Sequence, residues 1–251
     1  MSEKWLETRV VENRHWTEAL FSLRVEGAKL SFRAGQFVRI ALDLVEGDAG
    51  SRVARPFSFV NPPEDPVLEF YGIVVPQGPL SPRLANLRTG DALYVATNPA
   101  GFLVVSELPD AETLWLVSTG TGIAPFLSIL RTEAPWQRFG SVVLVHAVRH
   151  ARELVYREMI SNLVKGKNNF KYVTFVSREA APESLAGRIP AAIRDGRLEA
   201  AAGLRLGSEG SQVMLCGNPE MLTDVTAALA ERGMRKHRRR APGHITVESF
   251  W

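Results

Sequence analysis

The chain has 251 residues, a length typical of one large domain or two small ones. Hydrophobic residues make up 45% and charged residues 23%, and no apolar run approaches the ~18 residues of a membrane-spanning helix. The single cysteine, Cys216, excludes an internal disulfide, an all-cysteine zinc site and a protein-bound iron–sulfur cluster. Any electron chemistry would therefore need an organic cofactor or another protein. Because the N-terminus lacks the apolar core of a signal peptide, we expect a cytoplasmic protein without membrane contact.

The net charge of +3 is unevenly distributed along the chain. Residues 232–240 (RGMRKHRRR) hold six Lys or Arg and no acid, which leaves 24 basic and 27 acidic residues, a net charge of −3, elsewhere. One basic segment on a mildly acidic protein indicates an anionic partner, although a solvated surface explains it equally well. Nucleic acid is not favoured, because no aromatic residues are interleaved with the basic ones.

The first hundred residues contain short stretches rich in β-branched and aromatic residues, separated by turn residues. Strands are predicted at residues 8–13, 19–25, 36–42, 56–60, 67–75 and 92–97. The one helix predicted here covers 81–87, where Pro82 occupies a permitted first-turn position. Six strands and one helix favour a small, closed antiparallel barrel.

Beyond Pro109, predicted strands and helices alternate. The strands are expected at 113–118, 142–147, 172–177, 213–216 and 245–248, and the helices at 125–132, 152–164, 189–194 and 219–232. This order is typical of a parallel sheet that is covered by helices on both faces. The last helix has a clear start, with Asn218 as N-cap and Pro219 at the first helical position. A domain boundary is predicted between 101 and 110.

Two of these predicted strands end in glycine turns that run into helices: TGTGIAP at 119–125 and CGNPEM at 216–221. Glycines allow backbone N–H groups to approach a diphosphate at the positive end of a helix. The first turn departs from the dinucleotide fingerprint, because Pro125 stands where a third glycine is expected. Alone it is equally well explained as a plain tight turn. Two such turns at the carboxyl ends of parallel strands favour a dinucleotide site.

A second nucleotide signal lies in the predicted barrel. Arg55, Phe57 and Ser58 offer a charge, a flat ring and a hydroxyl, which a flavin nucleotide requires, although the tetrapeptide also fits an ordinary edge strand containing Pro56. The segment GPLSPRL at 78–84 reads as a turn entering a helix, with Ser81 at the N-cap position, and is therefore a candidate anion site. Together the signals predict two dinucleotides, one on the barrel and one on the sheet.

At this point the chain resembles the ferredoxin–NADP reductase family, in particular its bacterial ferredoxin/flavodoxin–NADP reductases. The resemblance rests on six segments in the family's order and covers essentially the whole chain: RPFSFVNPP, EFYGIVVPQGPLSPRL, STGTGIAPFLSIL, VSRE, CGNPEM and GMRKHRRRAPGHITVESFW. It implies a six-stranded antiparallel β-barrel with a capping helix, residues 1–105, that holds FAD. It also implies an α/β parallel-sheet domain, residues 106–251, that holds NADP(H) and ends in a tail returning to the flavin.

The resemblance assigns residues to FAD one by one. Arg55 is expected at the diphosphate, Phe57 against the flavin and Ser58 near its N5 atom. Family members commonly have tyrosine in place of Phe57, so stacking should persist while one hydrogen bond is lost. The remaining residues assigned to FAD are Ile73, Val74, Pro79, Leu80, Ser81, Thr119, Phe250 and Trp251.

A second set is assigned to NADP(H). Arg149 and Arg178 end successive predicted strands and Arg188 follows a glycine, so the three guanidinium groups are expected to converge on the 2′-phosphate that distinguishes NADP from NAD. As solvated surface residues they would carry no such meaning. The remaining residues assigned to NADP are Gly120, Thr121, Gly122, Ile123, Ser177, Cys216, Gly217 and Asn218.

Four residues are candidates for the reaction itself. The resemblance puts Cys216 near the nicotinamide and Phe250 over the flavin face, where the nicotinamide must eventually stack. Ser58 and Glu248 are expected to relay a proton to the flavin during hydride transfer between nicotinamide C4 and flavin N5. For Cys216 and Phe250, burial in an ordinary core is the alternative.

The function implied is electron transfer between NADP(H) and ferredoxin or flavodoxin by a monomeric FAD enzyme, with 232–240 docking the acidic carrier. Contact of some of these arginines with the adenylate part of FAD is the alternative. One alternative is an NAD(P)H:flavin or ferric-chelate reductase with loosely held flavin, against which the barrel motifs and the aromatic tail argue. Another is a non-catalytic electron-transfer subunit of a larger complex. Such subunits often carry a cysteine cluster, which this chain lacks.

Overall fold

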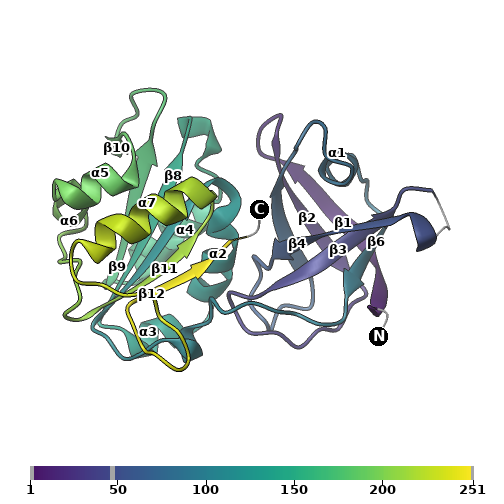
Figure 1. Cartoon of the computed structure of the whole chain (residues 1–251). Coiled ribbons are helices and arrows are strands. Elements are labelled where there is room, and N and C mark those ends of the chain that lie inside the picture. Colours follow the sequence, from purple (N-terminus) through teal and green to yellow (C-terminus); the bar gives the residue numbers. More distant parts are fainter. Residues whose placement is uncertain (1–2, 46–48, 250–251) are drawn as a thin grey trace.

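The computed structural model describes residues 3–45 and 49–249 and forms two domains that lie side by side (Figure 1). The N-terminal domain is an antiparallel sheet in the order β4-β3-β6-β1-β2-β5. Its strands are β1 Trp5–His15, β2 Leu20–Glu26, β3 Phe37–Asp43, β4 Arg52–Ser58, β5 Leu68–Ile73 and β6 Ala92–Ala96. The predicted barrel is confirmed, and a bridge between Phe59 and Phe70 joins its two outer strands, β4 and β5.

Alternating apolar residues fill the barrel, where Phe21, Leu23, Ile40, Phe70 and Val95 are almost fully buried. The helix predicted in this domain is shorter than expected: α1 covers Ser81–Ala85, and its buried Leu84 packs into the barrel core. Two single-turn 3₁₀ segments, η1 Ala49–Ser51 and η2 Val105–Glu107, flank the strands.

The C-terminal domain is a parallel sheet in the order β10-β9-β8-β7-β11-β12. Its strands are β7 Thr113–Thr119, β8 Ser141–Val148, β9 Phe170–Val176, β10 Ser184–Ala186, β11 Ser211–Cys216 and β12 Ile245–Glu248. The chain starts in the middle at β7, moves outward through β8, β9 and β10, and then returns to add β11 and β12 on the other side. The strand order therefore reverses between β7 and β11, which is where sheets of this kind bind ligands.

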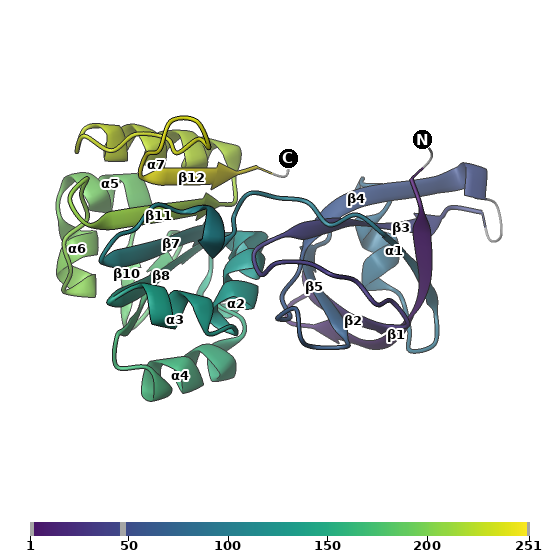
Figure 2. The same cartoon turned by 90° about the horizontal axis from the view of Figure 1, so that it is seen from below.

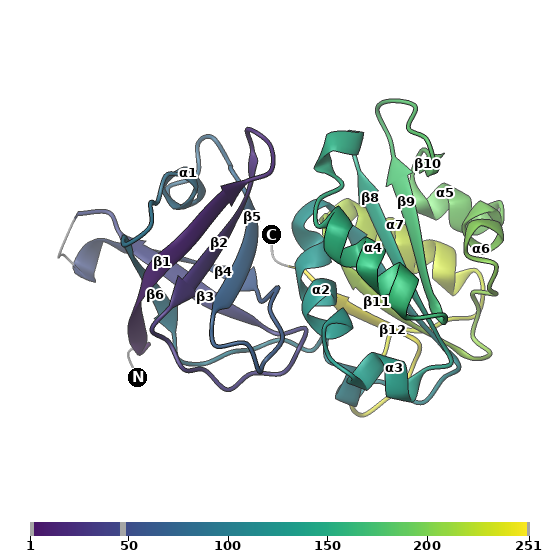
Figure 3. The ribbon, with the colours of Figure 1, turned by 180° about the vertical axis from the view of Figure 1, so that it is seen from behind.

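Helices cover both faces of the parallel sheet, with α2, α3 and α4 on one face and α5, α6 and α7 on the other (Figures 2 and 3). Their bounds are α2 Ala124–Leu130, α3 Ala134–Arg138, α4 Arg157–Gly166, α5 Ile189–Arg194, α6 Arg197–Ala202 and α7 Pro219–Ala230. The predicted cap of α7 is confirmed, because Asn218 Oδ1 accepts hydrogen bonds from the N–H groups of Glu220 (2.9 Å) and Met221 (3.3 Å).

The helix predicted at 152–164 is divided. A 3₁₀ turn, η4 Ala151–Glu153, is followed by an irregular stretch, and α4 begins only after Tyr156, whose φ of 57° is left-handed and cannot continue a helix. The short elements α3, α6 and β10 were not predicted.

One apolar core crosses the junction between the domains. Leu20, Val60 and Tyr71 of the barrel belong to the same buried cluster as Ile123 and Leu127 of the parallel-sheet domain. This shared apolar cluster opposes relative motion of the two domains. Within residues 3–45 and 49–249, no helix is both long and apolar enough to cross a membrane.

Candidate functional site

The two glycine turns lie next to each other at the point where the strand order reverses. The first forms a 3₁₀ turn, η3 Gly120–Ile123, between β7 and α2, and the second begins at Gly217 between β11 and α7. Thr119 Oγ1 accepts a 3.0 Å hydrogen bond from the Asn218 N–H, which ties the turns together. Gly217 has a φ of 140°, and a Cβ there would lie 2.2 Å from Thr119 Oγ1, so only glycine fits.

Gly122 makes a similarly close approach, because a Cβ at this position would lie 2.4 Å from the carbonyl oxygen of Cys216. The Gly122→Ala variant is therefore expected to lose about 2–3 kcal/mol of unfolding free energy, measured by urea denaturation. Gly120→Ala is the matched control: no atom lies within 4 Å of its Cβ position, and only the φ of 53° has a cost, about 1 kcal/mol. Equal losses in the two variants would contradict this account of the contact.

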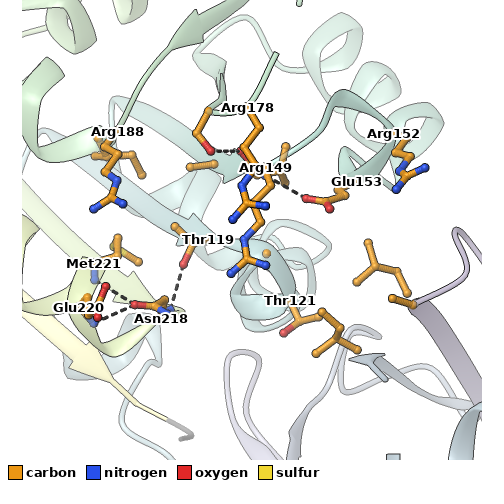
Figure 4. A pocket seen from close by; sticks show the side chains of 18 of the residues that line it. Thr119, Thr121, Arg149, Arg152, Glu153, Arg178, Arg188, Asn218, Glu220 and Met221 are labelled. Atoms are coloured by element: carbon orange, nitrogen blue, oxygen red, sulfur yellow. Dashed lines mark hydrogen bonds between the residues drawn. The ribbon is translucent and has the colours of Figure 1, made fainter. Parts of the chain in front are cut away.

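A cavity of about 450 Å³ opens above these turns and faces the barrel (Figure 4). Eight of the residues assigned to FAD or NADP from the sequence line it on the sheet side: Thr119, Gly120, Thr121, Arg149, Ser177, Arg178, Arg188 and Asn218. Four residues assigned to NADP do not line it. Gly122, Ile123 and Cys216 are buried beneath the turn, and Gly217 packs against Thr119.

The predicted arginine cluster is brought together by the ends of neighbouring strands. Arg149 follows β8 and Arg178 follows β9, and the Arg178 N–H donates a 3.0 Å hydrogen bond to the Arg149 carbonyl. Arg188 precedes α5, and Figure 4 shows all three side chains directed into the cavity. None of these three guanidinium groups forms an ion pair with a carboxylate of the described residues. They are free to bind an anion such as a phosphate.

The sequence reasoning missed two parts of the cavity. Arg152 is a fourth arginine at its edge, and its position three residues after Arg149 was the available signal. Residues 17–20, which form the barrel wall together with the expected Ile73, gave no signal, because the two segments are far apart in the chain. The Val74 N–H donates a 2.7 Å hydrogen bond to the Ala19 carbonyl and holds these segments together.

His146 was also missed. It is fully buried on β8, and its Nε2 lies 3.0 Å from the carbonyl oxygen of Gly120, the first residue of η3. Burial lowers the pKa of His146 to about 4, so the ring is neutral near pH 7. The neutral ring donates its Nε2 proton to Gly120 and holds the turn in place.

On the barrel, the predicted flavin residues follow β4 toward the domain junction. Arg55 is exposed, and its guanidinium donates a 2.8 Å hydrogen bond to the Ala54 carbonyl. Phe57 packs against Gly72 of β5, where a Cβ would lie 2.8 Å from the ring. Ser58, the last residue of β4, is buried.

The prediction that Ser81 is the N-cap of α1 is wrong. The N-cap position belongs to Leu80, whose side chain is buried in the barrel core, and no side chain caps the helix. The Ser81 hydroxyl instead accepts a 2.8 Å hydrogen bond from the Val75 N–H and closes the turn that contains Pro79. Competition from this nearby N–H explains the difference, because serine hydroxyls readily bond to local backbone. Beside this turn, Ile73 and Val74 form an apolar edge, and Ile73 is 37% exposed.

Glu248 and Cys216 lie side by side on β12 and β11, at the junction with the barrel. Glu248 Oε1 accepts a 3.1 Å hydrogen bond from the Phe102 N–H, whereas the buried Oε2 has no hydrogen-bond partner among the described residues. Burial raises the pKa of Glu248 to about 7 and also raises the pKa of the Cys216 thiol above its usual range. Cys216 is therefore a protonated, unreactive thiol, and Glu248 is a carboxyl group that titrates near neutrality.

Some cations of the basic segment 232–240 form ion pairs, and the others form none with the described residues. Arg232 forms a 2.5 Å ion pair with Glu199 and also bonds to backbone carbonyls, and Arg239 pairs with Glu107 at 3.0 Å. The other four cations are exposed: Arg235, Lys236, Arg238 and Arg240. The roles expected for Phe250 and Trp251 concern residues outside the part of the chain that the structure describes.

Comparisons with known proteins cover the whole chain. A family model described as an oxidoreductase NAD-binding domain matches residues 116–227. Flavodoxin/ferredoxin–NADP reductases of Shigella flexneri and Escherichia coli (strain K12) are 49% and 48% identical over 249 residues, which is 98% of this chain and 99% of each relative. A crystal structure of a ferredoxin NADP⁺ reductase from Neisseria gonorrhoeae with bound FAD and NADP matches with a TM-score of 0.93 at 32% identity, covering 99% of both chains.

Proposed function

The chain belongs to the flavodoxin/ferredoxin–NADP reductase family, and we propose that it transfers electrons between NADP(H) and a ferredoxin or flavodoxin through FAD. The observation that carries this proposal is the cavity at the reversal of strand order, which has arginines at one end and the barrel as its opposite wall. Residues 1–105 would hold FAD and residues 106–251 NADP(H).

The arginine end of the cavity suits NADP(H) rather than NAD(H). A 2′-phosphate would meet Arg149, Arg178 and Arg188, which have no carboxylate partners among the described residues. The adjoining glycine turns would receive the diphosphate on their backbone N–H groups, which His146 and Thr119 keep in position. Ser177, whose hydroxyl donates to the Val148 carbonyl, retains lone pairs that can accept further hydrogen bonds.

The barrel residues suit a flavin nucleotide. The exposed Arg55 guanidinium could bind a diphosphate, and the half-buried Phe57 ring offers an apolar surface for a flat ring. Thr119, Val74, Pro79, Leu80 and Ser81 would complete the FAD site through backbone and short side-chain contacts. When bound, FAD accepts two electrons as hydride from nicotinamide C4 and releases them one at a time.

Proton balance gives Glu248 its role. A hydride carries one proton and two electrons, so a proton must leave when only electrons pass to the carrier. Glu248 Oε2 is our candidate acceptor of this proton, because it is buried, has no hydrogen-bond partner among the described residues and belongs to a carboxyl group with a pKa of about 7. In the opposite direction the same carboxyl group would deliver a proton to the flavin, which is the relay expected from the sequence. Ser58 would relay the proton. It is opposite Phe37 of β3 in the sheet register, and a Cβ at Gly101 would lie 3.1 Å from Phe37 Cδ1 and 2.8 Å from Glu248 Oε1.

The exposed cations Arg235, Lys236, Arg238 and Arg240 support docking of an acidic ferredoxin or flavodoxin. We further propose that the enzyme is a cytoplasmic monomer without nucleic-acid or membrane partners. Cys216 would support the nicotinamide side from beneath the turn, because it is buried and its thiol stays protonated.

The purified protein tests this function directly. We expect yellow protein whose flavin absorbance bleaches far faster with NADPH than with NADH, and which then reduces a ferredoxin or flavodoxin at a rate that falls as salt concentration rises. Tightly bound flavin would separate this enzyme from a reductase of free flavin or ferric chelates. A protein without flavin, or one that NADPH does not bleach, would exclude the proposal.

A further inference from the structure

A network of side chains at the domain junction lies outside the proposed chemistry. At its centre, the Tyr156 hydroxyl donates a 2.8 Å hydrogen bond to Glu69 Oε1. Arg131 Nη1 lies 3.6 Å from Glu69 Oε2 and donates a 3.3 Å hydrogen bond to the Val60 carbonyl. Tyr156 and Arg131 belong to the parallel-sheet domain and Glu69 and Val60 to the barrel, so the network joins the two domains.

The backbone of Tyr156 is strained. Its φ of 57° is unusual for a bulky residue, and such conformations persist only where the surroundings hold them. The ring is 8% exposed and packs against two barrel rings, Trp16 at 4.7 Å and Tyr71 at 5.5 Å between centroids. These contacts and the hydrogen bond to Glu69 stabilise the strained conformation.

The barrel rings that hold Tyr156 belong to the wall of the cavity. Trp16 directly precedes the lining residues 17–20, and Tyr71 lies two residues before the lining residue Ile73. If the Tyr156 ring shifted, it would either push the barrel segments around Trp16 and Tyr71 or lose contact with them. Both segments lead into the barrel wall of the cavity.

The other side of Tyr156 leads to the arginine end of the same cavity. Glu153 Oε2 accepts hydrogen bonds from the N–H groups of Arg149 (2.9 Å) and His150 (3.3 Å). The Arg157 guanidinium donates to two backbone carbonyls of the same segment, at 2.7 and 2.9 Å. Residues 149–157 are thus a short, internally bonded unit that carries Arg149 at one end and Tyr156 near the other.

We propose that Tyr156 is a positioning residue that sets the spacing between the arginine end of the cavity and its barrel wall. This inference rests on the proposed function, in which one NADP(H) molecule binds the arginines and presents its nicotinamide to a flavin on the barrel. Hydride transfer depends steeply on that spacing, because a displacement near 1 Å can cost about 100-fold in rate. Binding of the 2′-phosphate alone does not depend on it.

The experiment separates the two ends of the cavity in the flavin-loaded protein. The Tyr156→Leu variant removes the hydroxyl and the ring contacts, and we expect flavin reduction by NADPH in a single turnover to slow about 10- to 100-fold. The affinity for adenosine 2′,5′-bisphosphate, which reaches only the arginine end, should stay within about twofold, far below the tenfold that 1.4 kcal/mol produces. Tyr156→Phe and Glu69→Gln remove only the hydrogen bond or the charge and should give smaller losses in the same direction.

Tyr172→Phe is the matched control, because it removes another buried tyrosine hydroxyl from the same domain, away from the cavity, and should leave both measurements unchanged. Tyr156→Phe keeps the test decisive if the leucine variant does not fold. The proposal is overturned if the variants reduce flavin as fast as the natural protein, or if bisphosphate affinity falls as much as the rate. If NADPH fails to reduce the flavin of the natural protein, the proposed function itself is wrong.

Discussion

Replacing Arg149 and Arg178 together by alanine is expected to weaken NADPH binding by about 10²- to 10⁴-fold and to leave NADH binding nearly unchanged. Each guanidinium lacks a carboxylate partner among the described residues and points into the cavity. Each charge-assisted hydrogen bond to a phosphate contributes about 1.5–3 kcal/mol, and about 1.4 kcal/mol corresponds to a factor of ten. The measurement is the concentration dependence of flavin reduction by each nucleotide.

Arg205→Ala is the control for this double variant, because it removes an exposed arginine that does not line the cavity. It should leave the constants for both nucleotides unchanged, which shows that loss of positive charge alone has little effect. An equal loss of affinity for NADPH and NADH in the double variant would mean that these arginines bind some part of the dinucleotide other than the 2′-phosphate.

The Glu248→Gln variant is expected to lower the rate of electron transfer from NADPH to the carrier about 10²-fold or more, because a proton acceptor is lost. The natural enzyme should gain activity as pH rises through about 7, where the buried carboxyl group ionises. The variant should lack this ionisation. Stopped-flow or steady-state rates between pH 5.5 and 9, a range chosen to bracket that pKa, measure both effects. An unchanged pH profile would remove Glu248 from the proton path.

The same carboxyl group makes stability depend on pH. Its folded-state pKa of about 7 lies above the ordinary value of 4.5, so its contribution is fully present below about pH 4.5 and is lost as pH rises through 7. The natural protein should therefore lose up to about 3 kcal/mol relative to Glu248→Gln across this range, at about 1.4 kcal/mol per unit of pKa shift. Urea unfolding of both proteins at several pH values measures the difference.

Local sequence patterns predicted the features that depend on local chemistry. The barrel strands follow from alternating apolar and β-branched residues, and α7 follows from Asn218 and Pro219 at its start. The arginine cluster was predictable because Arg149 and Arg178 each follow a buried strand, and parallel strands end at one edge.

Features that depend on tertiary contacts were not predictable. The break before α4 requires a left-handed Tyr156, which is held by two rings of the other domain, and no residue type at that position signals it. Ser81 is a residue type that commonly caps helices, but its hydroxyl accepts a hydrogen bond from the Val75 N–H instead. Which backbone N–H it binds depends on the folded turn. The barrel wall of the cavity joins residues 17–20 to Ile73, about fifty residues away in the chain, and only Ile73 was expected, from the family resemblance.

The apolar cluster shared by the barrel and the sheet has a practical consequence for dissecting this enzyme. A barrel expressed alone would expose Leu20, Val60 and Tyr71 to water, and the sheet domain expressed alone would expose Ile123 and Leu127. An uncovered patch of that kind promotes aggregation. Neither half is thus a self-sufficient module, and heating should melt the intact chain in a single cooperative transition rather than in two steps.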